Sequence, residues 1–95
     1  MSEIVLKQDS PSKGGWVIER DGQRIAEMTY SMAGDKVIID HTTVSDVLRG
    51  TGTGAKLVAA AADWARANGK KILPLCPFAK SVFDKKPELR DVLFG

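Results

Sequence analysis

A glycine-rich loop in the middle of the chain is the feature that most constrains its fold. The stretch RGTGTGAKLV (49–58) has glycines at positions 50, 52 and 54, and an apolar pattern with helical spacing follows directly. This pattern predicts a helix over 54–68, with Asn68-Gly69 as its C-terminal stop. Its apolar face consists of Leu57, Val58, Ala61, Trp64 and Ala65. The loop therefore lies at a helix N-terminus, where N–H groups and the helix dipole favour an anion.

Short strands come before this loop, and another strand follows the helix. Turn formers such as Asp21-Gly22 separate the stretches rich in β-forming residues, which are 3–8, 16–20, 24–32 and 36–44. A further strand over 71–76 completes a βαβ unit, whose two strands should be parallel. Pro77 and Pro87 each begin a short helical segment. We predict an α+β fold with antiparallel N-terminal strands, a βαβ unit and short C-terminal helices.

Three kinds of phosphate-binding loop contain glycines at close spacing. The P-loop pattern fails, because counting from Gly50 places Ala55 and Leu57 where a glycine and a Ser/Thr are required. The dinucleotide pattern G-x-G-x-x-G also fails, and the chain after Gly54 is too short for the sheet that carries it. The third pattern, R-x-x-G-x-G, fits from Arg49 onward and lets the backbone approach a pyrophosphate. A glycine turn that only caps a helix is the alternative.

The order strand, R-x-x-G-x-G, helix, strand resembles motif A of the GNAT superfamily of N-acetyltransferases. The chain is similar to the very small, YjdJ-like members of this superfamily. The stretches that carry the resemblance are IDHTTV (39–44), LRGTGTGAKLV (48–58), KILPLCPF (71–78) and KPEL (86–89). The resemblance covers nearly the whole chain. It implies a GNAT-like fold and an acetyl-CoA-dependent enzyme that transfers an acetyl group to an unidentified amine.

The resemblance also implies which residues bind coenzyme A (CoA). Arg49 and the amides of residues 50–54 would hold the pyrophosphate. The backbone of residues 41–44 would pair with the pantetheine arm, where the two parallel strands diverge. The cofactor-binding residues expected on this basis are His41, Thr42, Thr43, Val44, Arg49, Gly50, Thr51, Gly52, Thr53 and Gly54.

Cys76 is the only cysteine, and it lies where a predicted strand ends and a helix begins. A helix N-terminus stabilises a thiolate, which is the nucleophilic form of cysteine. Cys76 can therefore accept the acetyl group or donate a proton to departing CoA, although a free cysteine is often only a small buried hydrophobe. In the small acetyltransferases that the chain resembles, the matching cysteine is the suspected catalytic group.

His41 is the only histidine and the candidate general base. Strand alternation predicts that its side chain shares a face with Val37 and Ile39, opposite Asp40, which is a weaker candidate base. Both His41 and Cys76 would lie at the C-terminal ends of neighbouring parallel strands, where open sheets of this kind bind ligands. A base–nucleophile pair is therefore one hypothesis, and a packed or solvent-facing histidine is the other.

Composition limits the remaining classes of function. Ninety-five residues predict a single domain over 1–95, whose small core is compatible with a weak homodimer. A net charge of +2, without aromatics among the lysines, gives no indication of nucleic-acid binding. We expect a cytoplasmic protein, because there is no membrane-length apolar run, no signal sequence and one cysteine. One Cys and one His cannot complete a zinc site, so no metal is expected.

Two departures from larger GNAT enzymes bear on the mechanism. No tyrosine follows the second parallel strand to act as a general acid, and Leu89 stands where an aromatic is expected in close relatives. The chain is also short of the elements that would form an acceptor pocket. The alternatives to an N-acetyltransferase are therefore a module that binds CoA or acyl-CoA without turnover, and a small interaction domain.

Overall fold

Tight turns fold the first half of the chain into antiparallel strands. The computed structural model describes residues 4–48 and 50–94. Asp21 and Gly22 have φ values of 52° and 79°, the positive values that a tight hairpin turn requires. The strands joined in this way are β1 (Ile4–Ser10), β2 (Lys13–Arg20), β3 (Gln23–Ala33) and β4 (Lys36–Val44).

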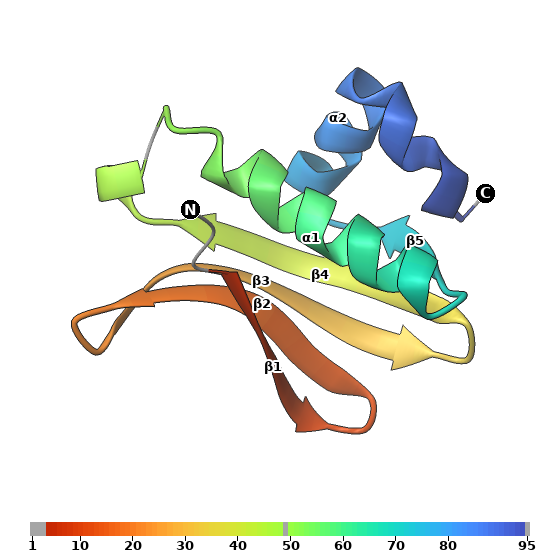
Figure 1. Cartoon of the computed structure of the whole chain (residues 1–95), viewed down its shortest axis with the longest axis horizontal. Coiled ribbons are helices and arrows are strands. Elements are labelled where there is room, and N and C mark those ends of the chain that lie inside the picture. The colour runs from red at the N-terminus through yellow and green to blue at the C-terminus, as the bar shows by residue number, and fades with distance from the viewer. Residues whose placement is uncertain (1–3, 49, 95) are drawn as a thin grey trace.

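Helices and one parallel strand make up the second half. A short 3-10 helix, η1 (Asp46–Leu48), leads through the glycine loop to α1 (Thr53–Ala67). Strand β5 (Lys71–Pro74) then pairs with β4 in parallel, which completes a five-stranded sheet in the order β1-β2-β3-β4-β5. Helices α2 (Pro77–Lys85) and η2 (Pro87–Val92) follow. The predicted α+β fold is confirmed (Figure 1).

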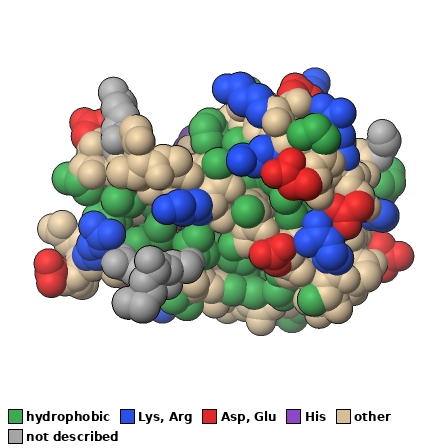
Figure 2. Space-filling view, turned by 45° about the horizontal axis from the view of Figure 1, so that its top comes forward, with side chains coloured by type: hydrophobic (Ala, Val, Ile, Leu, Met, Phe, Trp, Pro, Cys, Tyr) green, Lys and Arg blue, Asp and Glu red, His purple; other side chains and the backbone are tan. Residues whose placement is uncertain are grey.

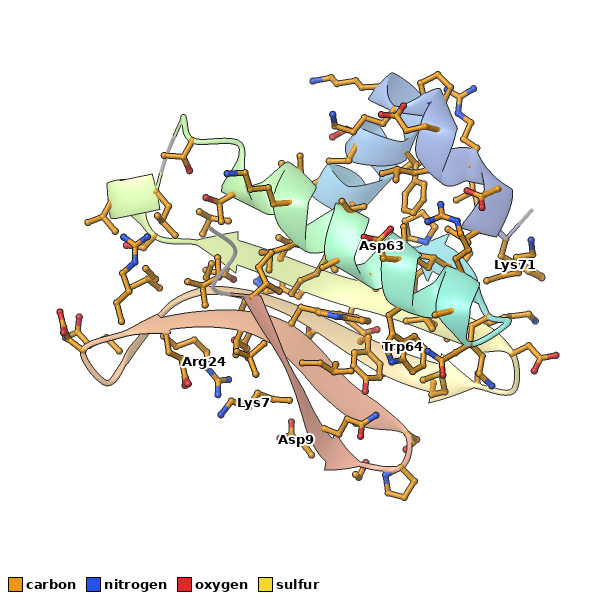
Figure 3. The ribbon with its side chains drawn as sticks, viewed as in Figure 1. Lys7, Asp9, Arg24, Asp63, Trp64 and Lys71 are labelled. Atoms are coloured by element: carbon orange, nitrogen blue, oxygen red, sulfur yellow. The ribbon has the colours of Figure 1, made fainter. Side chains whose placement is uncertain are left out.

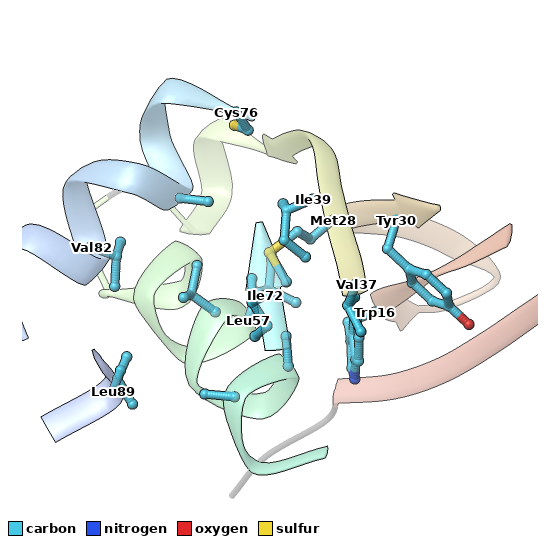
Figure 4. Close-up of a cluster of buried hydrophobic side chains, with 14 of the residues drawn as sticks. Trp16, Met28, Tyr30, Val37, Ile39, Leu57, Ile72, Cys76, Val82 and Leu89 are labelled. Carbon is cyan, nitrogen blue, oxygen red and sulfur yellow. The ribbon is translucent and has the colours of Figure 1, made fainter. Parts of the chain in front are cut away.

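The core lies between the sheet and the helices, all of which cover the same face (Figure 1). The predicted apolar face of α1 is buried there through Leu57, Val58, Ala61 and Ala65. Figure 4 shows this face against sheet residues such as Met28, Val37, Ile39 and Ile72, with Cys76 at the margin of the core. The indole of Trp64, labelled in Figure 3, lies 6.2 Å from that of Trp16, ring centre to ring centre. Both tryptophans therefore help to anchor α1 on the sheet.

Strand β2 begins earlier than the turn-rich sequence before Trp16 indicates. Gly14 and Gly15 belong to the strand. Neighbouring groups approach both residues too closely for a side chain to fit. A Cβ atom on Gly14 would collide with the Lys7 carbonyl and lie 2.8 Å from the Tyr30 hydroxyl. These glycines serve close packing between strands rather than a turn.

An ion pair and a hydrogen bond attach η2 to α1 and to β5 through Asp91. Arg66 of α1 donates to both carboxylate oxygens of Asp91 in η2, each at 2.7 Å. Lys71 at the start of β5 donates to the Asp91 carbonyl at 2.6 Å. On the opposite, uncovered face of the sheet, where Figure 3 labels Lys7 and Arg24, both cations form ion pairs with Glu19, at 3.6 and 3.7 Å. No helix within residues 4–48 and 50–94 is long and apolar enough to cross a membrane.

Candidate active site

The two parallel strands separate at their C-terminal ends and leave one edge of β4 open. Their pairing ends at Ile39 and Pro74, whereas β4 pairs with β3 as far as Val44. The N–H groups of Leu75 and Cys76 both donate to the Ile39 carbonyl at 3.1 Å, and no described strand pairs with β4 on this side beyond that point. The structure therefore contains the divergence that the sequence interpretation placed at residues 41–44.

Only alternate residues of this segment direct their backbone groups to the open edge. The N–H of Ser45 donates to the Ile25 carbonyl of the β3 side at 2.8 Å. Because backbone groups alternate between the two edges of a strand, those of His41 and Thr43 also face β3. The N–H and C=O groups of Thr42 and Val44 thus face the opening. The backbone groups of Val44 are free to bind an amide-containing chain there, whereas the Thr42 N–H also lies within reach of the Cys76 sulfur.

The glycine loop turns the chain into α1 through two left-handed residues. Gly50 and Gly52 have φ values of 80° and 75°, and Gly52 is the N-cap of the helix. The first N–H groups of α1 have no intrahelical acceptor, which leaves them available to an anion. The hydroxyl and N–H of Thr51 both donate to the Leu48 carbonyl and hold the turn, at 2.5 and 3.2 Å. Thr53 is buried at the start of α1. Arg49 lies outside the described residues.

A groove of about 340 Å³ separates this loop from α2. Gly54 lies where the walls meet, since a Cβ atom there would collide with the Phe78 ring. Side chains from α2 line the other wall. The lining residues are Val44, Leu48, Gly50, Gly52, Thr53, Gly54, Ala55, Phe78, Ser81, Val82, Lys85 and Lys86. The groove thus joins the open edge of β4 to the helix N-terminus.

Cys76 lies between the end of β5 and the start of α2. It is the N-cap residue of α2, is 7% exposed, and its Sγ lies 3.6 Å from Thr42 Oγ1. Burial raises the pKa of the thiol, but hydrogen bonds from the N–H groups of Ala79, Phe78 and Thr42 and from the Thr42 hydroxyl together outweigh burial. The net pKa is below that of an ordinary cysteine. The site therefore favours the thiolate over a merely buried thiol.

The prediction that His41 shares a face with Val37 and Ile39 is wrong, because a β-bulge reverses the alternation of β4. Tyr30 pairs with Ile39 and Thr29 pairs with His41, so Asp40 is an extra residue in β4. His41 is exposed on the face away from the helices, whereas Thr42 pairs with buried Met28 and takes the place beside Cys76. Asp40 accepts a hydrogen bond from the Ser31 hydroxyl at 2.8 Å.

Three side chains at the site were missed by the sequence interpretation. Thr42 was named for its backbone only, yet its hydroxyl contacts Cys76. Lys85 and Lys86 were given no role in the sequence interpretation, yet both line the groove. Leu89, at the position expected to hold an aromatic, is buried in the core. Within residues 4–48 and 50–94, no group of three or more His, Cys, Asp or Glu residues could hold a metal ion.

Comparison with known proteins identifies this arrangement. The model of the GCN5-related N-acetyltransferase family matches residues 15–92. An NMR structure from Staphylococcus aureus, assigned as a GCN5-like N-acetyltransferase, is 38% identical, with a TM-score of 0.72 over 100% of this chain and 92% of that one. A ribosomal-protein-alanine N-acetyltransferase from Brucella melitensis is 15% identical, with a TM-score of 0.66 over 80% and 62%. The comparison with curated proteins finds no match.

One further solved structure contains the co-substrate. A protein assigned as a streptothricin acetyltransferase from Bacillus anthracis, in complex with acetyl coenzyme A, is 22% identical to this chain. Its TM-score is 0.57 over 70% of this chain and 39% of that one, so the likeness concerns the fold.

The fold and the groove define an acyltransferase that uses acetyl-CoA. The chain belongs to the GCN5-related N-acetyltransferase family, as its resemblance to the GNAT superfamily predicts.

Proposed function

We propose that this protein transfers the acetyl group of acetyl-CoA to an amine by way of an acetyl-Cys76 intermediate. The observation that supports the covalent route is the environment of the Cys76 sulfur. Two N–H groups of α2 and the Thr42 hydroxyl favour its thiolate, at the point where β4 and β5 diverge. The lowered pKa of the thiol enlarges the thiolate fraction at any given pH, and the thiolate is the nucleophilic form of cysteine.

The first step is attack of the Cys76 thiolate on the thioester carbonyl. The new bond joins Cys76 sulfur to the acetyl carbon, the bond from that carbon to the CoA sulfur breaks, and CoA leaves as a thiolate that takes a proton from water. In this proposal the backbone of Thr42 and Val44 holds the pantetheine arm, and the amides of residues 50–54, with Arg49, hold the pyrophosphate. The glycine loop supports this role by leaving the first N–H groups of α1 without a side-chain cap or an intrahelical acceptor.

The second step returns the cysteine to its thiolate. A neutral amine attacks the acetyl-cysteine carbonyl, the carbon–sulfur bond breaks, and the amine nitrogen releases its extra proton to solvent. An ordinary lysine-type amine has a pKa of about 10.4, so transfer speeds up as pH rises. His41 takes no part in this scheme, because its side chain lies on the other face of the sheet. The acceptor is an amine whose identity is open.

Turnover and binding, measured on matched variants, test this proposal. Release of CoA from acetyl-CoA is followed across a panel of amines, and binding of CoA is measured by calorimetry. We expect Cys76→Ala and Cys76→Ser to bind CoA like the wild type and to lose amine-dependent release. Full turnover by Cys76→Ala would establish direct transfer instead. Binding without turnover of any amine by the wild type would favour a CoA-binding module.

A further inference from the structure

Two lysines stand on the wall of the groove that faces the glycine loop. Lys85 ends α2 and Lys86 follows it, and both are exposed while lining the groove opposite Gly50 and Gly52. Neither ammonium group forms an ion pair with any residue in the described part of the chain. Figure 2 shows Lys and Arg side chains, in blue, on the lobe that α2 and η2 form at the upper right.

The charged side chains that line the groove are all positive, whereas the neighbouring hollow has one positive and one negative side chain. No acidic residue in the described part of the chain lines the groove. The preceding acidic residue, Asp84, lines a different hollow together with Lys80, one helical turn earlier. The side chains of Lys80 and Asp84 therefore lie on a different side of α2 from the groove. The groove alone presents two cations without a counter-charge, which is the pattern that binds an anion of more than one negative charge.

The position of the lysines along α2 indicates which anion they meet. Cys76 caps the N-terminus of α2, and Lys85 lies nine residues later, roughly 14 Å along the axis at a rise of about 1.5 Å per residue. In the proposed function the thioester end of acetyl-CoA reaches Cys76 at the N-terminus of α2, so its phosphates lie toward the C-terminal end of that helix. The N–H groups at the start of α1, which have no intrahelical acceptor, suit the pyrophosphate. The remaining phosphate of CoA is the monoester on the ribose 3′ oxygen, which is also its most highly charged group.

We propose that Lys85 and Lys86 bind the 3′-phosphate of CoA and select CoA over its dephosphorylated form. This inference rests on the proposed function, because it assumes that acetyl-CoA occupies the groove. Lysine suits a solvated phosphate monoester, since its compact ammonium group can approach from several directions. The selection weakens with added salt, because the contacts are exposed and therefore screened.

A double-mutant cycle on protein and ligand tests this assignment. Binding of CoA and of 3′-dephospho-CoA is measured calorimetrically for the wild type and for Lys85→Gln/Lys86→Gln, with Lys80→Gln as the matched control on the same helix. We expect the double variant to bind CoA about tenfold more weakly, the product of two exposed ion pairs worth about threefold each. Its binding of dephospho-CoA should equal that of the wild type, and Lys80→Gln should change neither.

The results that would contradict the lysine assignment can be told apart from those that would contradict the proposed function. Equal losses for both ligands would place the lysines on the pyrophosphate, and no loss for either would remove them from the site; both results overturn the assignment. A wild type that binds CoA and dephospho-CoA equally well would overturn it too, while leaving the acetyltransferase proposal standing. If the wild type bound neither, the proposed function would fall first. Unfolding temperatures without ligand confirm that the exposed substitutions preserve the fold.

Discussion

The Thr42 hydroxyl is expected to control the reactivity of Cys76. It lies 3.6 Å from the sulfur and is one of the donors that lower the thiol pKa against the opposing effect of burial. Thr42→Val replaces the hydroxyl by a methyl group of similar volume and leaves the N–H donors of α2 in place. The pKa of Cys76 should therefore rise. A hydrogen bond to a charged group is worth about 1.5 kcal/mol at the lower end of its range, which this long contact favours.

That magnitude corresponds to a thiolate population about tenfold smaller at neutral pH. The assay is the rate of alkylation by iodoacetamide from pH 5 to 10, since only the thiolate reacts. The wild-type profile should rise through a pKa below that of a free cysteine, and the Thr42→Val profile should move to higher pH. Thr43→Val, on the opposite face, is the control and should match the wild type. Identical profiles for wild type and Thr42→Val would refute the role of the hydroxyl.

Three further outcomes are expected. Gly52→Ala forces a side chain into φ +75° and should lower the free energy of unfolding by about 1 kcal/mol in urea titrations; unchanged stability would contradict the left-handed cap. Gly54→Ala should displace the Phe78 ring, and the free energy of CoA binding should fall by more than the free energy of unfolding. Normal CoA affinity in calorimetry would contradict the position of Phe78 in the wall of the groove. His41→Ala should leave the pH profile of Cys76 alkylation unchanged, whereas a moved profile would mean that the two groups interact.

Most helices, strands and turns could be predicted from the sequence, because each is signalled by a few adjacent residues. The helical spacing after Gly54, the turns at Asp21-Gly22 and Gly34, and Pro77 after β5 depend on a few adjacent residues each. The same holds for the glycine loop, whose left-handed residues are both glycines.

The details of the site depend on pairing between distant segments. The bulge at Asp40 arises from the register between β3 and β4, and no residue within β4 signals it. Simple alternation therefore placed His41 on the face of Val37 and Ile39, where the structure has Thr42 beside Cys76. The groove wall formed by Lys85 likewise exists only because α2 packs near the N-terminus of α1. Sequence periodicity gives the face of each element but not which faces meet.

The central claim is that Cys76 carries the acetyl group during transfer. Its most direct test is the intact mass of the protein after rapid mixing with acetyl-CoA in the absence of any amine, followed by peptide mapping in acid. The account predicts a gain of one acetyl group on Cys76, absent in Cys76→Ala and lost on brief treatment with hydroxylamine. An unmodified Cys76 in protein shown to be saturated with acetyl-CoA would contradict it.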